Sequence, residues 1–315
     1  MGENNIYIAA CTPDGGIFHY HMDKEGYLSF SDMIQVDRPM YIVHNNGILY
    51  ASLRCPFAES AYSGVISIPL CKNGIMKSPS DAVSTLGEVS AHLCVHNGVV
   101  YTANYISGSV SKLPNRTVRH FGQSVNAIRQ KSPHPHFITF DPPQKYILTA
   151  DLGLDTIFTY TTDLDLVDKA TVPAGSGCRH LAFSELGDTV WCVNELSSDI
   201  SVFKYMDGHL EYLETVPAMP DTYSDSSIAA AIRTDYNNVY ISHRGYDAIS
   251  VFSCLGAHLS KQKDIPCGGR GPRDFIVEND CIICTNEKSD SVTVIRNDTV
   301  IQEIELPSPI SVIAV

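Results

Sequence analysis

Several side chains that could carry out chemistry stand at matching points of a repeated strand pattern. One aligned column, at the start of the first strand of each repeat, reads Met40, His92, His136, His180, Ala231, Asp274 and Ile310. The position before it reads Pro39, Ala91, Pro135, Arg179, Ala230, Arg273 and Pro309. Imidazole and guanidinium groups are costly to bury without a partner or a task, so their convergence here predicts a site. For any single histidine of this column, a structural hydrogen-bonding role is the alternative.

A second column lies at the end of the second strand of each repeat. It reads Tyr105, Leu152, Glu195, Arg244 and Glu287, each preceded by Asn, Asp or His. The preceding polar residues favour a structural turn, because such side chains bond nearby backbone amides. Glu195 and Arg244 differ from the rest because they are oppositely charged and belong to neighbouring repeats. They form either a structural ion pair or part of a catalytic site.

The elements that carry these columns recur about every 45 residues, a period typical of β-propeller blades. Each repeat contains an alternating apolar strand, a turn at Asn, Asp or Gly, a second apolar strand and then a third. We therefore predict an all-β fold, a seven-bladed β-propeller of four-stranded blades, with residues 1–315 as a single domain. In such a ring the first strands surround a central channel, so both columns would face that channel.

The two ends of the chain complement one another. Residues 309–315 resemble the first strand of a repeat that has no second strand, whereas residues 6–11 resemble a second strand that has no first. Pairing these segments would close the ring and remove two exposed sheet edges. The sequence thus predicts that the N- and C-terminal strands share one blade.

Charge and cysteine content narrow the possible partners and location. The formal net charge of −13 disfavours nucleic acid or an anionic membrane as a partner, but permits an anionic small molecule bound by clustered arginines. No long apolar run or signal peptide is visible, so we expect a cytoplasmic protein. The ten cysteines are expected to be reduced, and Cys281 and Cys284 should point to opposite faces of one strand.

No metal or other cofactor is expected. His92, His136 and His180 could in principle bind a metal ion, but nearby arginines make a poor environment for a cation. The sequence leaves the oligomeric state open.

The chain resembles the lactonase family of seven-bladed propellers, which includes bacterial 6-phosphogluconolactonase and fungal carboxy-cis,cis-muconate cyclase. The matching stretches are SAHLCVHNGVVYTANYISGSVS (90–111), SVNAIRQKSPHPHFITFDP (124–142), ADLGLDTIFTY (150–160), GSGCRHLAFSELGDTVWCVNELSSDISVFKY (175–205), YISHRGYDAISVF (240–252) and GPRDFIVENDCIICTNEKSDSVTV (271–294). The chain departs from the family pattern at Cys178, at His243 and in the segment ASLRC (51–55), and its first two blades match loosely.

The resemblance implies a metal-independent site at the channel mouth. Its proposed catalytic residues would be His136 (or, less well matched, His134), Arg179, Glu195 and Arg244. Candidate substrate-binding residues, from the resemblance and from the columns together, are His92, Ser124, Asn126, Arg129, His180, Arg273 and Asp274.

These residues suit hydrolysis of a sugar lactone, with 6-phosphoglucono-δ-lactone of the pentose phosphate pathway as the expected substrate and 6-phosphogluconate as its product. His136 or Glu195 would activate water, and Arg179 would polarise the carbonyl oxygen. Arg244, with Arg129 or Arg273, would hold the anionic end. One alternative is a muconate-type lactonizing cycloisomerase. Another is a non-catalytic propeller that binds a sugar acid or a protein.

Overall fold

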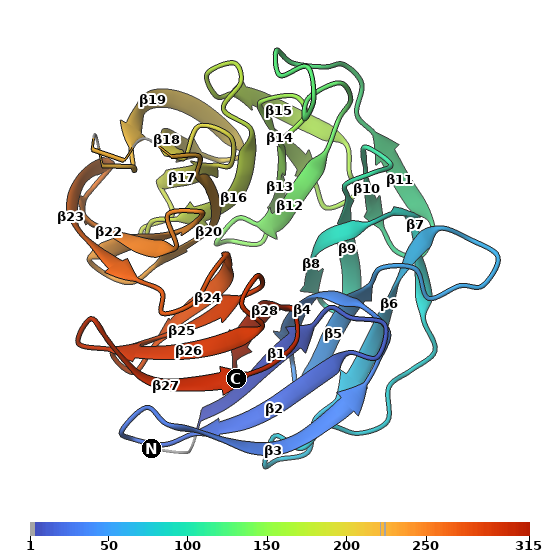
Figure 1. Cartoon of the computed structure of the whole chain (residues 1–315). Helices are drawn as coiled ribbons and strands as arrows, with labels where there is room; N and C mark the ends of the chain where they lie inside the picture. Colours follow the sequence, from blue (N-terminus) through green and yellow to red (C-terminus); the bar gives the residue numbers. More distant parts are fainter. Residues whose placement is uncertain (1–3, 221, 224) are drawn as a thin grey trace.

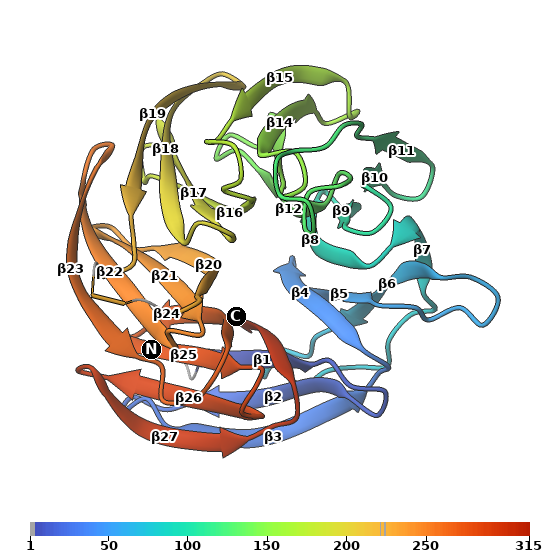
Figure 2. The same cartoon turned by 45° about the horizontal axis from the view of Figure 1, so that its top comes forward.

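A computed structural model describes residues 4–220, 222, 223 and 225–315, and it forms a ring of seven antiparallel four-stranded sheets (Figures 1 and 2). The described residues contain strands and turns but no α-helix, and hence no helix that could cross a membrane. The all-β, seven-bladed prediction is confirmed.

The blades follow one another along the chain, and six of them use four consecutive strands. The first blade contains β28 (Pro309–Ala314), β1 (Asn4–Ala10), β2 (Gly16–Met22) and β3 (Leu28–Gln35). The second and third contain β4 (Pro39–Asn45), β5 (Ile48–Leu53), β6 (Tyr62–Pro69) and β7 (Val83–Glu88), then β8 (Ser90–His96), β9 (Val99–Asn104), β10 (Ser109–Lys112) and β11 (Arg116–Arg119).

The remaining blades repeat the same order from the channel outward. The fourth contains β12 (Pro135–Phe140), β13 (Tyr146–Asp151), β14 (Thr156–Thr161) and β15 (Leu166–Thr171), and the fifth β16 (Cys178–Phe183), β17 (Thr189–Asn194), β18 (Asp199–Met206) and β19 (His209–Pro217). The sixth contains β20 (Ile228–Thr234), β21 (Asn238–Arg244), β22 (Ala248–Leu255) and β23 (His258–Pro266), and the seventh β24 (Pro272–Glu278), β25 (Cys281–Asn286), β26 (Ser291–Arg296) and β27 (Thr299–Glu305).

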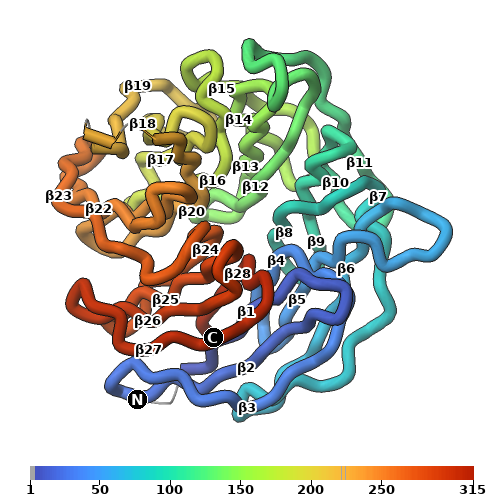
Figure 3. Tube along the Cα trace, viewed as in Figure 1, coloured from blue at the N-terminus to red at the C-terminus, as the bar shows by residue number. Residues whose placement is uncertain are grey.

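The predicted closure of the ring is confirmed by the first blade, where β28 from the C-terminus pairs with β1 from the N-terminus (Figure 3). The register runs from Ile6 opposite Ala314 to Ala9 opposite Ser311. Two backbone hydrogen bonds between Asn5 and Val315, of 3.2 and 2.8 Å, extend it. Pairing the two ends of the chain gives the first blade its inner strand and covers the edge of β1 that would otherwise be exposed.

The core lies between the blades, because the middle strands are covered on both faces. All six residues of β17 are buried, whereas no residue of β19, the outermost strand of the same blade, is fully buried. Cys281 packs in the cluster shared with the first blade, and Cys284 packs in the cluster shared with the sixth. The two cysteines therefore point to opposite faces of β25, as predicted from their spacing.

A β-bulge near the start of every inner strand sets the geometry of the channel mouth. The residues left out of the strand pairing are Met40, Ala91, His136, Arg179, Ala230 with Ala231, Arg273 and Ile310. A bulge bends the strand and redirects a side chain, and bulges are enriched beside active sites.

The bulges correct the first column that we aligned from the sequence. His136 is equivalent to Arg179 and Arg273, whereas His92, His180 and Asp274 lie one residue further along their strands. The alignment matched residues by type and placed both levels in one column, because an extra residue in a strand leaves no local sign in the sequence.

Candidate functional site

Three arginines from different segments converge on one buried carboxylate at the channel mouth. Glu195, directly after β17, accepts hydrogen bonds at Oε2 from Arg179 Nε and from Arg244 Nη2, both at 2.9 Å. Its other oxygen, Oε1, accepts a bond from Arg129 Nη2 at 2.6 Å. Glu195 and Arg179 are 3% and 2% exposed. The structure thus brings together three of the four predicted catalytic residues, and the predicted binding residue Arg129 joins them.

The electrostatics of this cluster favour its charged form. Burial by itself would raise the pKa of the Glu195 carboxyl, but Arg244, Arg179 and Arg129 together hold that pKa well below its usual range. Burial lowers the pKa of Arg179 to about 9, so its guanidinium still carries a charge near pH 7. The cluster has three positive charges against one negative charge. It therefore presents excess positive charge to a ligand in a poorly solvated place.

The turn before β16 fixes both Glu195 and Arg179. The carbonyl of Gly177 accepts a hydrogen bond from the backbone N–H of Glu195 at 2.7 Å. The backbone N–H of Gly177 donates to the Asp155 carboxylate at 2.6 Å. Gly177 has a φ of 69°, and a Cβ atom there would lie 2.7 Å from Leu196 Cγ. Glycine is therefore required, and Arg179 follows two residues later in the bulge of β16.

His136 occupies the equivalent bulge of β12 in the neighbouring blade. It is 7% exposed, and together with Arg179 it lines a cavity of about 10 Å³. That volume is close to the smallest space that holds one water molecule. Burial, reinforced by the charge of Arg179, keeps the pKa of the His136 imidazole well below 6.5, so the ring is neutral at pH 7. Its Nδ1 atom has no hydrogen-bond partner among the described residues.

The loop between β11 and β12 delivers Arg129 to the cluster. Asn126 Oδ1 accepts the backbone N–H groups of Ile128 and Arg129, both at 3.0 Å, and Ser124 donates to Asp155 at 2.5 Å. The predicted binding residues Ser124 and Asn126 thus use these groups to shape the loop. Arg129 also donates to the Tyr105 hydroxyl at 3.2 Å, which adds that tyrosine to the site.

His134, the less well matched candidate, stacks on Tyr105 with 4.4 Å between ring centroids. Its Nδ1 lies 2.9 Å from the Tyr105 carbonyl oxygen. His134 therefore packs against Tyr105, whereas His136 lines the small cavity together with Arg179.

Aromatic rings fill the channel below the site. Tyr41 and His92 lie 4.0 Å apart between centroids, His92 and Phe137 4.1 Å, and Phe137 and His180 4.7 Å. His92 faces a different cavity, of about 380 Å³, along the channel, so the structure separates this predicted binding residue from the cluster. His180 lines the small cavity from this deeper level.

Asp274, another predicted binding residue, also lines the small cavity. It forms a buried ion pair with Arg233 of β20 and accepts the backbone N–H of Phe275 at 3.0 Å. Arg273, in the bulge beside it, pairs with Glu287 at 3.0 Å and lies on the wall of the small cavity. Both residues therefore lie at the site, and the charge of each is balanced by an ion pair.

Two residues of the mouth were missed when the second column was read from the sequence. The backbone N–H of the residue after the second strand donates to the carbonyl before the inner strand in six blades, at 2.7–3.1 Å. These donors are Cys11, Arg54, Tyr105, Leu152, Glu195 and Glu287, and Arg244 ends the second strand of the sixth blade. The ring formed by the ends of the second strands thus also contains Cys11 and Arg54, which the second column lacked. The available signal was the segment ASLRC at the end of β5, where four of the other blades have Asn or Asp before the residue of this ring.

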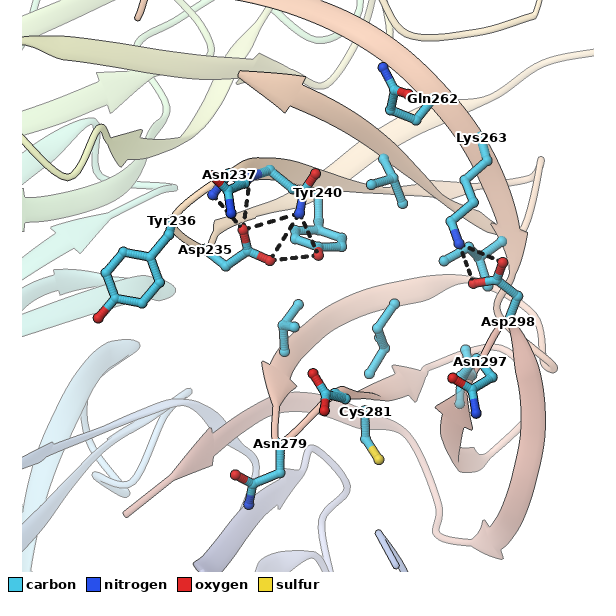
Figure 4. A pocket seen from close by; sticks show the side chains of 17 residues that line it. Asp235, Tyr236, Asn237, Tyr240, Gln262, Lys263, Asn279, Cys281, Asn297 and Asp298 are labelled. Carbon is cyan, nitrogen blue, oxygen red and sulfur yellow. Dashed lines mark hydrogen bonds and ion pairs between the residues drawn. The ribbon is translucent and has the colours of Figure 1, made fainter. Parts of the chain in front are cut away.

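A larger cavity, of about 820 Å³, lies at the opposite end of the propeller between the sixth and seventh blades (Figure 4). It is lined by the β20–β21 and β24–β25 turns, at the far ends of strands that reach the site. Lys263 and Asp298 pair there at 2.5 and 2.6 Å, and Asp235 accepts the Tyr240 hydroxyl at 2.7 Å. None of the predicted site residues lines this cavity. The described parts of the chain contain no group of three or more His, Cys, Asp or Glu side chains that could bind a metal ion.

Fold and site together define a β-propeller with a buried ionic site at one end of its channel. The chain belongs to the family described as Lactonase, 7-bladed beta-propeller, whose model matches residues 5–312. The match includes the first two blades, which the sequence motifs had related only loosely.

Similar proteins come from several bacteria. A Staphylococcus aureus protein whose name gives no activity is 28% identical, with 92% of each chain covered. The periplasmic gluconolactonase of Pseudomonas aeruginosa superposes with a TM-score of 0.90 at 22% identity, covering 100% of this chain and 99% of that one. A candidate 6-phosphogluconolactonase from Bacteroides fragilis gives 0.89 at 23% identity, covering 99% and 98%. At these identities the two structures support the fold.

Proposed function

We propose that the protein hydrolyses a sugar lactone, with 6-phosphoglucono-δ-lactone as substrate and 6-phosphogluconate as product. The observation that carries this proposal is the arrangement of neutral His136 and charged Arg179 around one water-sized cavity. Membership of the lactonase family supports the reaction type. An excess of arginines in the cluster suits an anionic substrate and a developing oxyanion.

We assign the role of general base to His136 rather than to Glu195. Glu195 is bonded to three arginines, and they stabilise its charge so strongly that it is a poor proton acceptor. His136 is neutral near pH 7, and its Nδ1 has no hydrogen-bond partner among the described residues, so the ring has a lone pair free to take the proton of a water molecule in the reaction. Glu195 then acts as a positioning residue that holds the arginines.

In the proposed reaction, the oxygen of a water molecule bonds to the lactone carbonyl carbon while His136 takes its proton. Arg179 stabilises the negative charge that develops on the carbonyl oxygen. The ring C–O bond then breaks, and the proton passes from His136 to the ring oxygen to form a hydroxyl. The carboxylic acid product ionises at neutral pH and releases one proton to solution.

Acid release in a pH-stat tests this function. The purified protein would be given 6-phosphoglucono-δ-lactone, unphosphorylated gluconolactone and, separately, carboxy-cis,cis-muconate, with spontaneous hydrolysis subtracted. Faster acid release from the phosphorylated lactone is the expected result. Turnover of the muconate alone would instead identify a lactonizing cycloisomerase, and it would register as proton uptake because ring closure converts a carboxylate into an ester and protonates carbon. Binding of a sugar acid without any turnover would identify a binding module.

A further inference from the structure

One arginine of the channel mouth is set apart from the others by its lack of a partner. Arg129, Arg179 and Arg244 share Glu195, and Arg273 pairs with Glu287. Within residues 4–220, 222, 223 and 225–315, the exposed Arg54 side chain has no ion-pair or hydrogen-bond partner. Its charge is therefore available to a ligand.

The backbone places Arg54 at the mouth. Its N–H donates to the Arg38 carbonyl at 3.1 Å, the same bond that Glu195 makes with Gly177 at 2.7 Å. Arg54 is thus the second blade's equivalent of Glu195 in the ring of second-strand ends. The second and fifth blades lie three positions apart in a ring of seven, so β5, which Arg54 follows, lies across the ring from β17, which Glu195 follows (Figure 2).

Positive charge gathers on this side of the mouth. Arg38 lies 3.2 Å from Cys55 Sγ, and Cys11 Sγ lies 3.6 Å from Met40 Sδ. Burial raises the pKa of the Cys11 thiol and the Glu287 carboxylate adds to that rise, whereas the nearby charges of Arg273, Arg54 and Arg38 oppose it. Three guanidinium groups, two beside the inner strands of the second blade and one in the seventh blade, therefore act on the same point.

We propose that Arg54 is a specificity-determining residue that binds the phosphate group of the substrate, on the side of the mouth opposite Glu195. This inference rests on the proposed function, because it takes the lactone ring to lie at His136 and Arg179. A lactone with an anionic substituent would then be held at both ends. The arginines around Glu195 would contact the reacting ester, and Arg54 would contact the phosphate oxygens through its guanidinium fork.

Steady-state kinetics of three variants test the inference. Arg54→Gln removes the charge, Arg54→Lys keeps it without the fork, and Arg270→Gln removes an exposed arginine of the β23–β24 connection as a matched control. With 6-phosphoglucono-δ-lactone, Arg54→Gln should raise KM about tenfold with kcat nearly unchanged, and Arg54→Lys should restore part of the loss. With unphosphorylated gluconolactone neither variant should differ from the wild type. Arg270→Gln should behave as the wild type with both substrates.

Two results would overturn the inference: an unchanged KM for the phosphorylated lactone in Arg54→Gln, or equal losses for both lactones. If the wild-type protein hydrolyses neither lactone, the proposed function fails. Calorimetric binding of 6-phosphogluconate to the wild type and to Arg54→Gln then tests the role of Arg54 independently of turnover. Affinity at least tenfold weaker in Arg54→Gln supports phosphate binding by Arg54. Equal affinity, or no binding by the wild type, contradicts it.

Discussion

The two ends of the propeller hold ionic groups of the same kinds in different ways. At the mouth, Arg179 and Glu195 are 2% and 3% exposed and share a buried cluster. At the opposite end, the side chains of Lys263 and Asp298 are 48% and 47% exposed, and their charges pair in solvent. Burying charges carries a large desolvation penalty, whereas an exposed pair contributes little. Burial of the charges, rather than their number or the size of the cavity, therefore distinguishes the end where we propose the reaction.

The largest effect should come from Arg179→Ala, which removes the proposed oxyanion donor. We expect kcat for lactone hydrolysis to fall about 10²–10³-fold, as for the loss of one such donor in other enzymes. Lys263→Ala removes one positive charge at the opposite end and should leave kcat unchanged. The pH-stat assay measures both, with circular dichroism to verify folding. Full activity in Arg179→Ala would exclude this arginine from the site.

Glu195→Gln should reduce stability, because it leaves three arginines close together without their shared carboxylate. Breaking a buried ion pair in this way costs about 3–5 kcal/mol of unfolding free energy. Urea denaturation followed by fluorescence measures the change. If the loss were below about 1 kcal/mol, the size typical of an exposed pair, the cluster would not be the buried network described above.

Acidification should weaken the fold through the channel histidines. Burial keeps the pKa values of His92, His136 and His180 well below 6.5 in the folded protein, whereas unfolding returns them to about 6.5. The unfolded state therefore binds more protons below that pH, and stability falls as the pH drops. Each histidine contributes a slope of up to about 1.4 kcal/mol per pH unit.

His92→Phe tests this dependence away from the proposed chemistry, since His92 packs between Tyr41 and Phe137. Unfolding free energies at pH 7.5 and about 5.5 should differ less in this variant than in the wild type, by the contribution of one histidine. An identical pH dependence would mean that folding leaves the pKa of His92 at its unfolded value, which would contradict the burial argument.

The smallest effect is expected for Asp298→Asn at the opposite end. The Lys263–Asp298 pair is exposed and should contribute less than about 1 kcal/mol. Urea denaturation at low and high salt would measure that contribution, which should shrink as salt screens it. A loss comparable to that of Glu195→Gln would remove the contrast between the two ends.

The sequence predicted the fold because each blade repeats its strands and turns, and the unmatched ends required closure. It also predicted the Arg179–Glu195–Arg244 group, since repeat position and family motifs agree there. It misplaced His92, His180 and Asp274 because bulges shift the register without a local signal. The Arg233–Asp274 pair joins two blades and follows no fixed spacing. A cytoplasmic location, the absence of nucleic-acid and membrane partners and the pentose phosphate role stay predictions.

The most direct test of the account is the pH dependence of kcat/KM for 6-phosphoglucono-δ-lactone in the wild type and in His136→Gln. If neutral His136 is the base, the wild-type value should stay level from about pH 8 to 6.5 and fall only at lower pH. His136→Gln should lose about 10²–10⁴-fold in kcat/KM and lack this acid limb. A variant with the wild-type rate and the same pH profile would contradict the assignment of His136 as the base.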